Sequence, residues 1–396
     1  MSKDRTPVIV SATRTPVGRY LGGLSTLPAT RLGAIAIREA VKRAGVDAGA
    51  VNEVIMGMVV QGGAGQAPAR QAAIHGDIPD DVPAMTINKV CGSGLKAVML
   101  ASQAIKAGDA ECIVAGGMES MSTSPHYVYG MRGGIKYGDG KLVDSVQFDG
   151  LWCSFGDNVM GAYAEYTAEK ASITREEQDQ YAFESHQKAV AAIEGGKFKA
   201  EIVPVEIPGR KGQVTVVDTD EGPRKDTSLE VLAKLRPAFQ KDGSVTAGNA
   251  PGLNDGGSAL VVTSQAFAEA HGLAVLARVT GYTAAGGPPK ELFFAPIKAV
   301  QNLMAKTKTA IGAYDLIEAN EAFSVQALAD GRALGWDWGR VNVHGGAVAL
   351  GHPIGASGAR ILTTLLYAMQ DRGAATGLAT LCLGGGNAVA LSVERV

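Results

Sequence analysis

A cysteine directly before a predicted helix is the strongest chemical signal in this sequence. Cys91 lies in NKVCGSGLKA, where a Gly-Ser-Gly run leaves room for a substrate and a helix begins near residue 92. The free N–H groups and the positive dipole end of such a helix stabilise a thiolate, so we expect a pKa below the usual value of about 8.5. We predict that Cys91 is a nucleophile; the alternative is an unreactive thiol packed at a crowded helix start.

A histidine and a second cysteine lie in glycine-rich turns later in the chain. His352 is part of HGGAVALGHPIGASGAR, and a histidine held in such a turn can deprotonate a thiol or donate to a developing oxyanion. Cys382 precedes three glycines in LATLCLGGGNAVAL, which predicts a second thiol, able to carry a proton, at the mouth of a pocket. The alternatives are a histidine on the surface and a cysteine in the core.

Other polar groups and thiols have less distinctive surroundings. Asn320, in EANEAFSVQAL, either caps a helix or holds a water against a reacting oxygen, and this segment alone leaves both open. We expect His344 to be a surface residue and Cys112 to be a core residue. The four cysteines lack the paired spacing of a zinc site, so we predict free thiols.

Alternating strands and helices are expected to position these groups. Apolar runs predict strands at 7–12, 54–59, 111–116, 259–263, 316–319, 378–382 and 388–393. Apolar residues at three-to-four spacing predict helices at 32–44, 94–107, 296–306, 324–334 and 358–372. Glycines end many of the short apolar runs, as in tight strand-to-helix turns. The sequence therefore predicts an α/β protein.

Two stretches of the chain are similar to each other. CGSGLKAVMLA and GASGARILTTL share a Ser-Gly opening and an apolar helix with one basic residue, and each is followed by a strand and a glycine run, CIVAGG and LCLGGG. This similarity indicates a tandem duplication of one α/β unit, with a site between the two halves. The stretch from about 120 to 249 differs in character and is predicted to be an inserted, partly irregular region that carries binding function.

Composition excludes several classes of function. The 37 Lys and Arg residues nearly balance the 39 Asp and Glu residues, and no run of basic residues forms an arm, so a nucleic acid is not expected as a partner. No apolar run is long enough to cross a bilayer, and MSKDRTPVIVSATRTPVG lacks the long apolar segment of a signal peptide. We therefore expect a cytoplasmic protein without a membrane partner.

The motifs together resemble the thiolase family. The patterns NxxCxSG, NEAF, GHPxGxSG and CxGGG follow the family's order, with KLRPAF and GSVTAGNAPGLNDGG between them, and the resemblance covers essentially the whole chain. It implies a five-layered α/β/α/β/α sandwich of two duplicated βαβαβαββ halves with an inserted loop domain. The expected parts are an N-terminal half at 1–119, completed by 250–270, a loop domain at 120–249 and a C-terminal half at 271–396.

The resemblance also implies roles for individual residues. Cys91 takes the acyl group, His352 activates that thiol and helps to bind the thioester oxygen, and Cys382 is the acid and base of the second half-reaction. Asn320 holds a water that completes one oxyanion site with His352, and the N–H groups of Cys91 and Gly384 form the other. The substrate is a coenzyme A thioester, and no metal or permanently bound cofactor is expected.

Further positions are implied to contact coenzyme A. Arg224 would approach the nucleotide phosphates, and the pantetheine and acyl groups would contact Met160, Phe239, Ala247, Pro251 and Phe323. An exposed charge and ordinary core packing are the alternatives for these residues. The chain departs from the family at Val159, where relatives usually carry His, and at Pro251, where many carry Ser. Both changes remove polar contacts to the substrate and leave the reactive groups intact.

Acetyl-CoA C-acetyltransferase is the activity we expect among thiolases. The bulky Leu292, Phe293 and Phe294 narrow the pocket toward acetyl and acetoacetyl groups if they lie beside Cys91. The alternative is a 3-ketoacyl-CoA thiolase of broader or longer chain specificity. Cys382 argues against a ketoacyl synthase, and the retained reactive residues argue against an inactive scaffold. The segment 121–141, rich in Tyr, Gly and Met, suits a loop that reaches a neighbouring subunit, and the resemblance implies a homotetramer.

Overall fold

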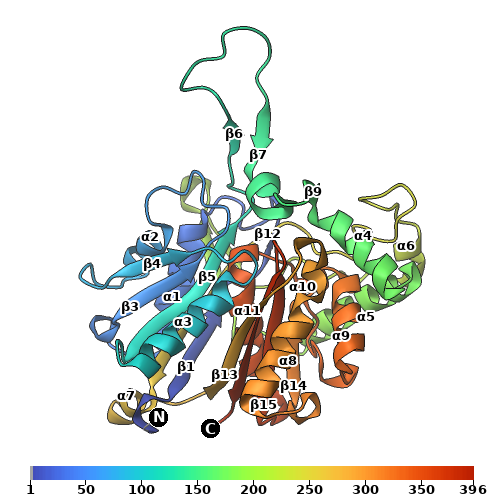
Figure 1. Cartoon of the computed structure of the whole chain (residues 1–396). Coiled ribbons are helices and arrows are strands. Elements are labelled where there is room, and N and C mark those ends of the chain that lie inside the picture. The colour runs from blue at the N-terminus through green and yellow to red at the C-terminus, as the bar shows by residue number, and fades with distance from the viewer. Residues whose placement is uncertain (1–2) are drawn as a thin grey trace.

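The computed structural model describes residues 3–396, and its core consists of two similar halves (Figure 1). The first half contains β1 (Pro7–Arg14), β3 (Glu53–Gly57), β4 (Ala84–Ile87), β5 (Cys112–Ser120) and β12 (Asn254–Ser264), with helices α1 (Ala29–Ala44), α2 (Pro68–His75) and α3 (Ser93–Ala107). The second contains β13 (Ala277–Gly286), β14 (Leu316–Ala319), β15 (Thr376–Leu383) and β16 (Asn387–Glu394), with α8 (Ala295–Thr307), α9 (Ser324–Leu334), α10 (Ala347–Leu350) and α11 (Ile354–Arg372). The short α7 (Gln265–Ala270) connects them.

The strands pair in the same order in both halves. In the first half β3 runs parallel to β4 and β5, β5 runs antiparallel to β12, and β12 runs antiparallel to β1. In the second half β14 runs parallel to β15 and forms a parallel bridge to Val341, β15 runs antiparallel to β16, and β16 runs antiparallel to β13. The two halves therefore share one strand order, in agreement with the similarity between two stretches of the sequence.

The two half-sheets enclose a layer of helices. β1 and β13 join the half-sheets through only two residue pairs, Val8 with Arg278 and Ile9 with Ala277. Between the half-sheets α3 and α11 pack against each other, while α1 and α2 cover one outer face and α8, with α9 beside it, covers the other. The predicted five-layered α/β/α/β/α sandwich is therefore confirmed.

Each of the seven predicted strands and five predicted helices overlaps an element of the two halves, whereas the helices and strands of the insertion were not predicted. The strand predicted at 316–319 and the helix predicted at 324–334 agree fully with β14 and α9. We missed β13 because its residues alternate between buried and exposed and form no continuous apolar run. The helix predicted at 358–372 begins four residues earlier, as α11, because Gly355 and Gly358 weaken the helical pattern there.

A long insertion distinguishes the first half from the second. Between β5 and β12 lie β6 (His126–Val128), β7 (Leu142–Asp144), β8 (Trp152–Cys153), β9 (Asn158–Val159), α4 (Met160–Ala171), α5 (Arg175–Glu194), β10 (Val205–Pro208), β11 (Val214–Val217) and α6 (Leu229–Ala233). The equivalent connection in the second half, between β15 and β16, is only three glycines long. The predicted limits of the three parts of the chain stay a prediction.

A buried ion network fastens this insertion to β1. The Arg14 guanidinium donates to both oxygens of Asp220, at 2.6 and 2.8 Å, and to Glu201 at 2.6 Å, and all three side chains are buried. Thr364 on α11 also donates to Glu201. Since each charge has charged partners and hydrogen bonds, its burial is compensated.

No helix in residues 3–396 is long and apolar enough to cross a membrane.

Candidate active site

A cavity of about 510 Å³ brings together residues from both halves and the insertion. Its walls include Cys91 from the loop before α3, His352 from the loop before α11, and Cys382 with Gly384 from the end of β15. These four residues come from three segments that are far apart in the sequence. A nucleophilic thiol, a possible base, a second thiol and a backbone N–H group therefore share one enclosed space.

The loop that carries Cys91 is held in an unusual backbone conformation. Val90 has a φ of 45°, which is rare for a β-branched residue and costs conformational energy. Two side chains maintain it: the Val90 N–H donates to Asn88 at 2.9 Å, and the Ser93 hydroxyl donates to the Val90 carbonyl at 2.6 Å. Cys91 thus has a fixed position two residues before α3 begins.

Our expectation of a low pKa for Cys91 was wrong. Desolvation in the cavity, with a contribution from the nearby Glu119 carboxylate, raises the pKa of the half-buried Cys91 thiol to about 12. The N–H groups of Gly384 and of Cys91 itself donate to the sulfur and lower its pKa, but desolvation is the larger effect. The resting Cys91 is therefore a neutral thiol.

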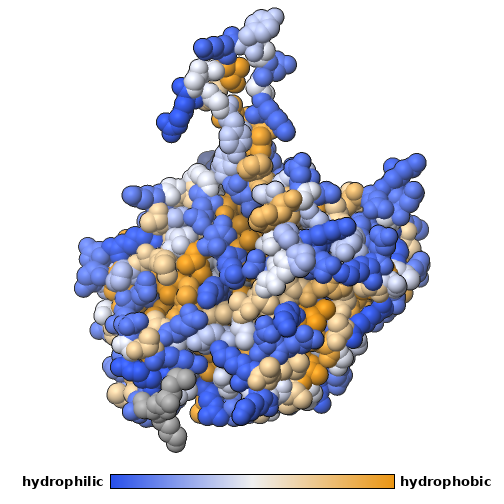
Figure 2. All heavy atoms as spheres, viewed as in Figure 1, coloured by the Kyte–Doolittle hydropathy of each residue, from blue (hydrophilic) through white to orange (hydrophobic). Residues whose placement is uncertain are grey.

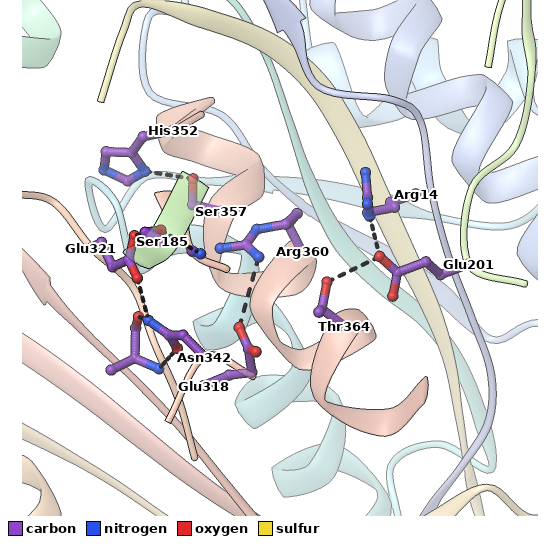
Figure 3. Close-up of polar contacts among 12 residues, drawn as sticks. Arg14, Ser185, Glu201, Glu318, Glu321, Asn342, His352, Ser357, Arg360 and Thr364 are labelled. Carbon is purple, nitrogen blue, oxygen red and sulfur yellow. Dashed lines mark hydrogen bonds and ion pairs between the residues drawn. The ribbon is translucent and has the colours of Figure 1, made fainter. Parts of the chain in front are cut away.

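The hydrogen bonds of His352 define which ring nitrogen carries the proton. Its Nδ1 lies 2.6 Å from the Ser357 hydroxyl, which itself lies 2.9 Å from the Pro353 carbonyl (Figure 3). A hydroxyl has one proton, so when Ser357 donates to the carbonyl it accepts from Nδ1–H. Within the described residues the His352 Nε2 has no hydrogen-bond partner, so it is left as a free acceptor. Asn254 accepts from the His352 backbone N–H at 2.8 Å and fixes the residue's place.

His352 is neutral at ordinary pH. Burial lowers its pKa to about 3, and the positive charge of Arg360 contributes in the same direction. The neutral Cys91 thiol and the neutral His352 imidazole therefore line one cavity, and they do not form a thiolate–imidazolium pair at rest. These two neutral groups exchange a proton only as another bond forms to the sulfur, which is general-base catalysis.

Cys382 lies inside the cavity wall, not at its mouth as we predicted. Only 1% of the residue is exposed to solvent, because it packs into an apolar cluster that includes Phe293 and Phe323. Burial raises its pKa well above the usual value, and the Cys91 thiol and Asp330 add to the shift. Cys382 is therefore a protonated thiol at rest.

Asn320 is fully buried next to the cavity and is not among the residues that line it. Neither its amide nitrogen nor its amide oxygen has a hydrogen-bond partner in the described chain. Both atoms are therefore able to bind a water molecule, which buried polar groups usually do.

The turn that contains Asn320 is fixed by a residue whose role sequence analysis missed. The Glu321 carboxylate accepts from Asn342, from the Val348 N–H, and from Tyr181 and Ser185 on α5 (Figure 3). These bonds join the insertion to the second half directly behind the site. A buried carboxylate that ends a strand cannot be assigned such partners before the fold is known.

The residues implied to contact coenzyme A divide between two cavities. Those that line the main cavity, together with Val159, are Met160, Phe239, Ala247, Pro251 and Phe323. Arg224 lines an adjoining polar cavity of about 240 Å³ with Arg19 and His186. The two cavities share Ala247, Ala250, Gly252 and Leu253. Arg224 is thus separated from the reactive thiols by the shared wall.

Aromatic rings form one side of the main cavity. Phe293 packs edge-on against Phe323, with centroids 5.3 Å apart, and Phe323 packs in the same way against Phe239 at 6.1 Å. Leu292 also lines the cavity, whereas Phe294 does not and lies under the ammonium group of Lys170. Two of the three bulky residues predicted to narrow the pocket are therefore in place to do so.

Two further expectations concern residues outside the cavity. Cys112 is buried in the core, as predicted. His344 is also buried, contrary to our prediction, because it packs edge-on against Phe198 and lies 3.7 Å from Asp371. Within residues 3–396, no three His, Cys, Asp or Glu side chains are grouped to hold a metal ion.

Comparison with known proteins establishes the family. The model of the thiolase N-terminal domain matches residues 7–266, and that of the thiolase C-terminal domain matches residues 273–395. The chain belongs to the thiolase family. This thiolase is 57% identical over 388 residues to an acetyl-CoA acetyltransferase of Pseudomonas aeruginosa, covering 98% of this chain and 99% of the relative. An acetyl-CoA acetyltransferase of Cupriavidus necator is 54% identical with the same coverage.

A solved structure shows the same fold. The crystal structure of the acetyl-CoA acetyltransferase of Bacillus anthracis superposes with a TM-score of 0.97 at 43% sequence identity, and 99% of each chain is covered. The five-layered arrangement of this thiolase is therefore that of the family over its whole length.

We predict that Ser357→Ala disturbs the proton position on His352. In the unchanged protein, ¹⁵N NMR should show a protonated Nδ1 and an unprotonated Nε2 from pH 5 to 8, because a pKa of about 3 keeps the ring neutral throughout. Without the Ser357 hydroxyl the tautomers should mix, and acetylation of Cys91 by acetyl-CoA at pH 7 should slow by about tenfold, part of the effect of a general base.

Ser102→Ala is the matched control for this variant. Ser102 is also a buried serine that donates to the carbonyl four residues earlier, that of Val98 on α3. It should leave both the histidine spectrum and the acetylation rate unchanged. A single unchanged tautomer in Ser357→Ala would contradict the assignment.

Proposed function

We propose that this thiolase is an acetyl-CoA C-acetyltransferase, which condenses two acetyl-CoA molecules to acetoacetyl-CoA and free coenzyme A through an acetyl-Cys91 intermediate. The observation that carries this proposal is the presence of two thiols and a neutral histidine with a free Nε2 on one apolar cavity. The names of the relatives, at 57% and 54% identity, support acetyl-CoA as the substrate.

The first half-reaction uses Cys91 and His352. As the Cys91 sulfur attacks the thioester carbonyl of acetyl-CoA, its proton moves to the free His352 Nε2. The N–H groups of Cys91 and Gly384, which already point at the sulfur, stabilise the negative charge on the carbonyl oxygen. The coenzyme A thiolate then leaves and takes the proton from His352, which leaves an acetyl group on Cys91.

The second half-reaction uses Cys382. The Cys382 proton first passes to the free His352 Nε2, and the Cys382 thiolate then removes a proton from the methyl group of a second acetyl-CoA. The resulting carbanion attacks acetyl-Cys91 and releases the Cys91 thiolate. The protonated His352 Nε2 and a water on Asn320 donate to the enolate oxygen, and His352 then gives its proton to the released Cys91 thiolate. In the reverse direction Cys382 gives its proton to the leaving acetyl carbanion, and its raised pKa keeps it in the protonated state that this step requires.

The proposal needs no bound cofactor, since coenzyme A enters and leaves as a substrate. The pantetheine would lie along Met160, Phe239, Ala247, Pro251 and Phe323, and the nucleotide would extend toward Arg224. We also propose a cytoplasmic location, where four unpaired cysteines stay reduced.

A homotetramer is part of the proposal. The segment from β6 to β7 stands clear of the body and exposes apolar side chains among polar ones, including Tyr129, Met131, Ile135 and Tyr137 (Figure 2). Such side chains on a projecting segment suit contact with another subunit. Light scattering should give about four times the chain mass of 40.8 kDa, and deletion of 130–141 should lower it. A monomeric mass for the unchanged protein would contradict this part.

Cleavage of acetoacetyl-CoA by free coenzyme A tests the two-thiol mechanism. Cys91→Ser should abolish both the turnover and the acetylation of residue 91, because the nucleophile is lost. Cys382→Ser should lower turnover by roughly 10³-fold, within the range for acid–base groups. Acetyl-CoA should still acetylate Cys91 in that variant, since the first half-reaction does not need Cys382.

Cys112→Ala is the control, because Cys112 is a buried thiol in the core of the first half. It should retain full turnover. If Cys382→Ser were as active as the unchanged enzyme, the assignment of the second thiol would be wrong.

The aromatic wall sets the expected acyl chain length. Phe293 and Leu292 line the cavity and narrow the space for the acyl chain. Acetoacetyl-CoA should therefore be cleaved faster than 3-ketohexanoyl-CoA. Phe293→Ala should raise kcat/KM for 3-ketohexanoyl-CoA relative to acetoacetyl-CoA by about tenfold or more. Phe294→Ala, next to it but outside the cavity, should leave the ratio unchanged. Faster cleavage of the longer substrate by the unchanged enzyme would favour the alternative, a 3-ketoacyl-CoA thiolase of broader specificity.

A further inference from the structure

A buried carboxylate lies between the loops that carry Cys91 and His352. Glu119 is near the end of β5 and has no exposed surface. Its neighbour Met118 contacts α1 at Gly33, and successive side chains of a strand point to opposite faces. The Glu119 side chain therefore points away from α1, toward the interface between the halves.

Three backbone N–H groups donate to this carboxylate. The Val59 and Gly355 N–H groups donate to Oε2 at 3.0 and 2.9 Å, and the Val60 N–H donates to Oε1 at 3.3 Å. Gly355 is the second residue of α11, three residues after His352. One carboxylate therefore joins the loop after β3, in the first half, to the start of α11, in the second.

A chain of bonds continues from this carboxylate to Cys91. The Val59 carbonyl accepts from the Asn88 side chain at 3.3 Å, and Asn88 in turn accepts from the Val90 N–H. Val90 is the strained residue directly before the nucleophile. Glu119 is thus linked to the Cys91 loop through three successive hydrogen bonds, and to the start of α11, next to the His352 loop, through one.

No cation neutralises Glu119 in the described chain. The acidic Asp255 on β12 and the Cys91 thiol are its ionisable neighbours, and α11 brings the neutral His352. On α3, Lys96 and Lys106 form no ion pair with it, and Arg360 of α11 pairs with Glu318. On β3 the only ionisable residue is Glu53, at the opposite end of the strand. Among the described residues, the charge of Glu119 is therefore balanced only by the dipoles of the N–H groups that donate to it, and this charge acts on Cys91.

We propose that Glu119 is a positioning residue that holds the Cys91 loop and the His352 loop in one arrangement, and that its charge limits the reactivity of the Cys91 thiol. Burial raises the pKa of Glu119 to about 7, so its charge changes near neutral pH. A proton on Oε1 breaks only the long bond from Val60 and keeps the two bonds on Oε2. The loops then stay in place while the negative charge next to Cys91 disappears.

The pH dependence of Cys91 alkylation tests this proposal. Iodoacetamide reacts with the thiolate, so the rate rises with pH. In the unchanged enzyme the rise should flatten near pH 7, where Glu119 becomes charged and opposes ionisation of Cys91. In Glu119→Gln the flattening should disappear: the rate should match the unchanged enzyme at pH 6 and exceed it by roughly three- to tenfold at pH 8, since one pKa unit is tenfold. Mass spectrometry of the Cys91 peptide gives the rate at that residue.

Turnover provides a second readout that moves in the opposite direction. The amide nitrogen of Glu119→Gln has no lone pair and faces the Val60 N–H as a second donor, whereas a protonated Oε1 keeps a lone pair and can turn its proton away. The Val59–Val60 loop should therefore shift, and kcat for acetoacetyl-CoA cleavage should fall by roughly 10- to 100-fold, as for loss of groups that orient reactive residues, with KM little changed. Glu119→Asp keeps the charge but cannot span both loops; it should lose kcat and keep the flattening near pH 7. The alkylation assay needs no acyl-CoA, so it decides the role of Glu119 even if the proposed function is wrong.

Glu165→Gln is the matched control. Glu165 is also a buried glutamate that accepts backbone N–H groups, from Ser244 and Val245, but it does not act on Cys91. It should leave the alkylation profile unchanged. General loosening of the structure by Glu119→Gln would raise alkylation equally at every pH, and this outcome, or an unchanged profile and kcat, would overturn the proposal. If Glu119→Gln does not fold, the profiles of the unchanged enzyme and of Glu119→Asp still decide it.

Discussion

The close contact between α3 and α11 is the constraint on which the site depends. A Cβ atom on Gly94 would lie 2.6 Å from the backbone nitrogen of Ala359, and one on Gly358 would lie 2.3 Å from that of Leu95. Any side chain at either position would force the helices apart. Because Cys91 lies two residues before α3 and His352 two residues before α11, this contact between the helix starts also sets the separation of the nucleophile and the base.

The duplication explains why the two helix starts support related tasks. Ser93 and Ser357 precede the two interface glycines, and each hydroxyl donates to a carbonyl in the loop before its own helix. In the first half this bond maintains the strained turn before the nucleophile, whereas in the second half the same hydroxyl also fixes the proton on the base. One structural unit, used twice, thus supplies both members of the proposed reacting pair, and the insertion adds Phe239 to an aromatic wall whose other rings, Phe293 and Phe323, come from the second half.

Sequence patterns predicted what depends on local order, and they failed where long-range burial decides. Motif spacing identified Cys91, His352 and Cys382, which line one cavity, and periodicity placed α9 and β14. The pKa of Cys91 was predicted in the wrong direction because the helix terminus is visible in the sequence and the desolvation is not. The burial of His344 and the bonds of Glu119 likewise depend on segments that meet only in the folded chain.

Burial of Cys91 has a consequence for the intermediate as well as for the resting enzyme. A thiol with a raised pKa is a poorer leaving group, so its acetyl ester transfers the acyl group less readily than the ester of an ordinary thiol. The N–H groups of Cys91 and Gly384 act in the opposite sense, because they stabilise negative charge only when it develops on the sulfur or the carbonyl oxygen. In the proposed mechanism desolvation therefore protects acetyl-Cys91 between the half-reactions, and the two dipoles lower the barrier when a second substrate arrives. Both effects require the enclosed cavity, because water would weaken the dipoles and hydrolyse the ester.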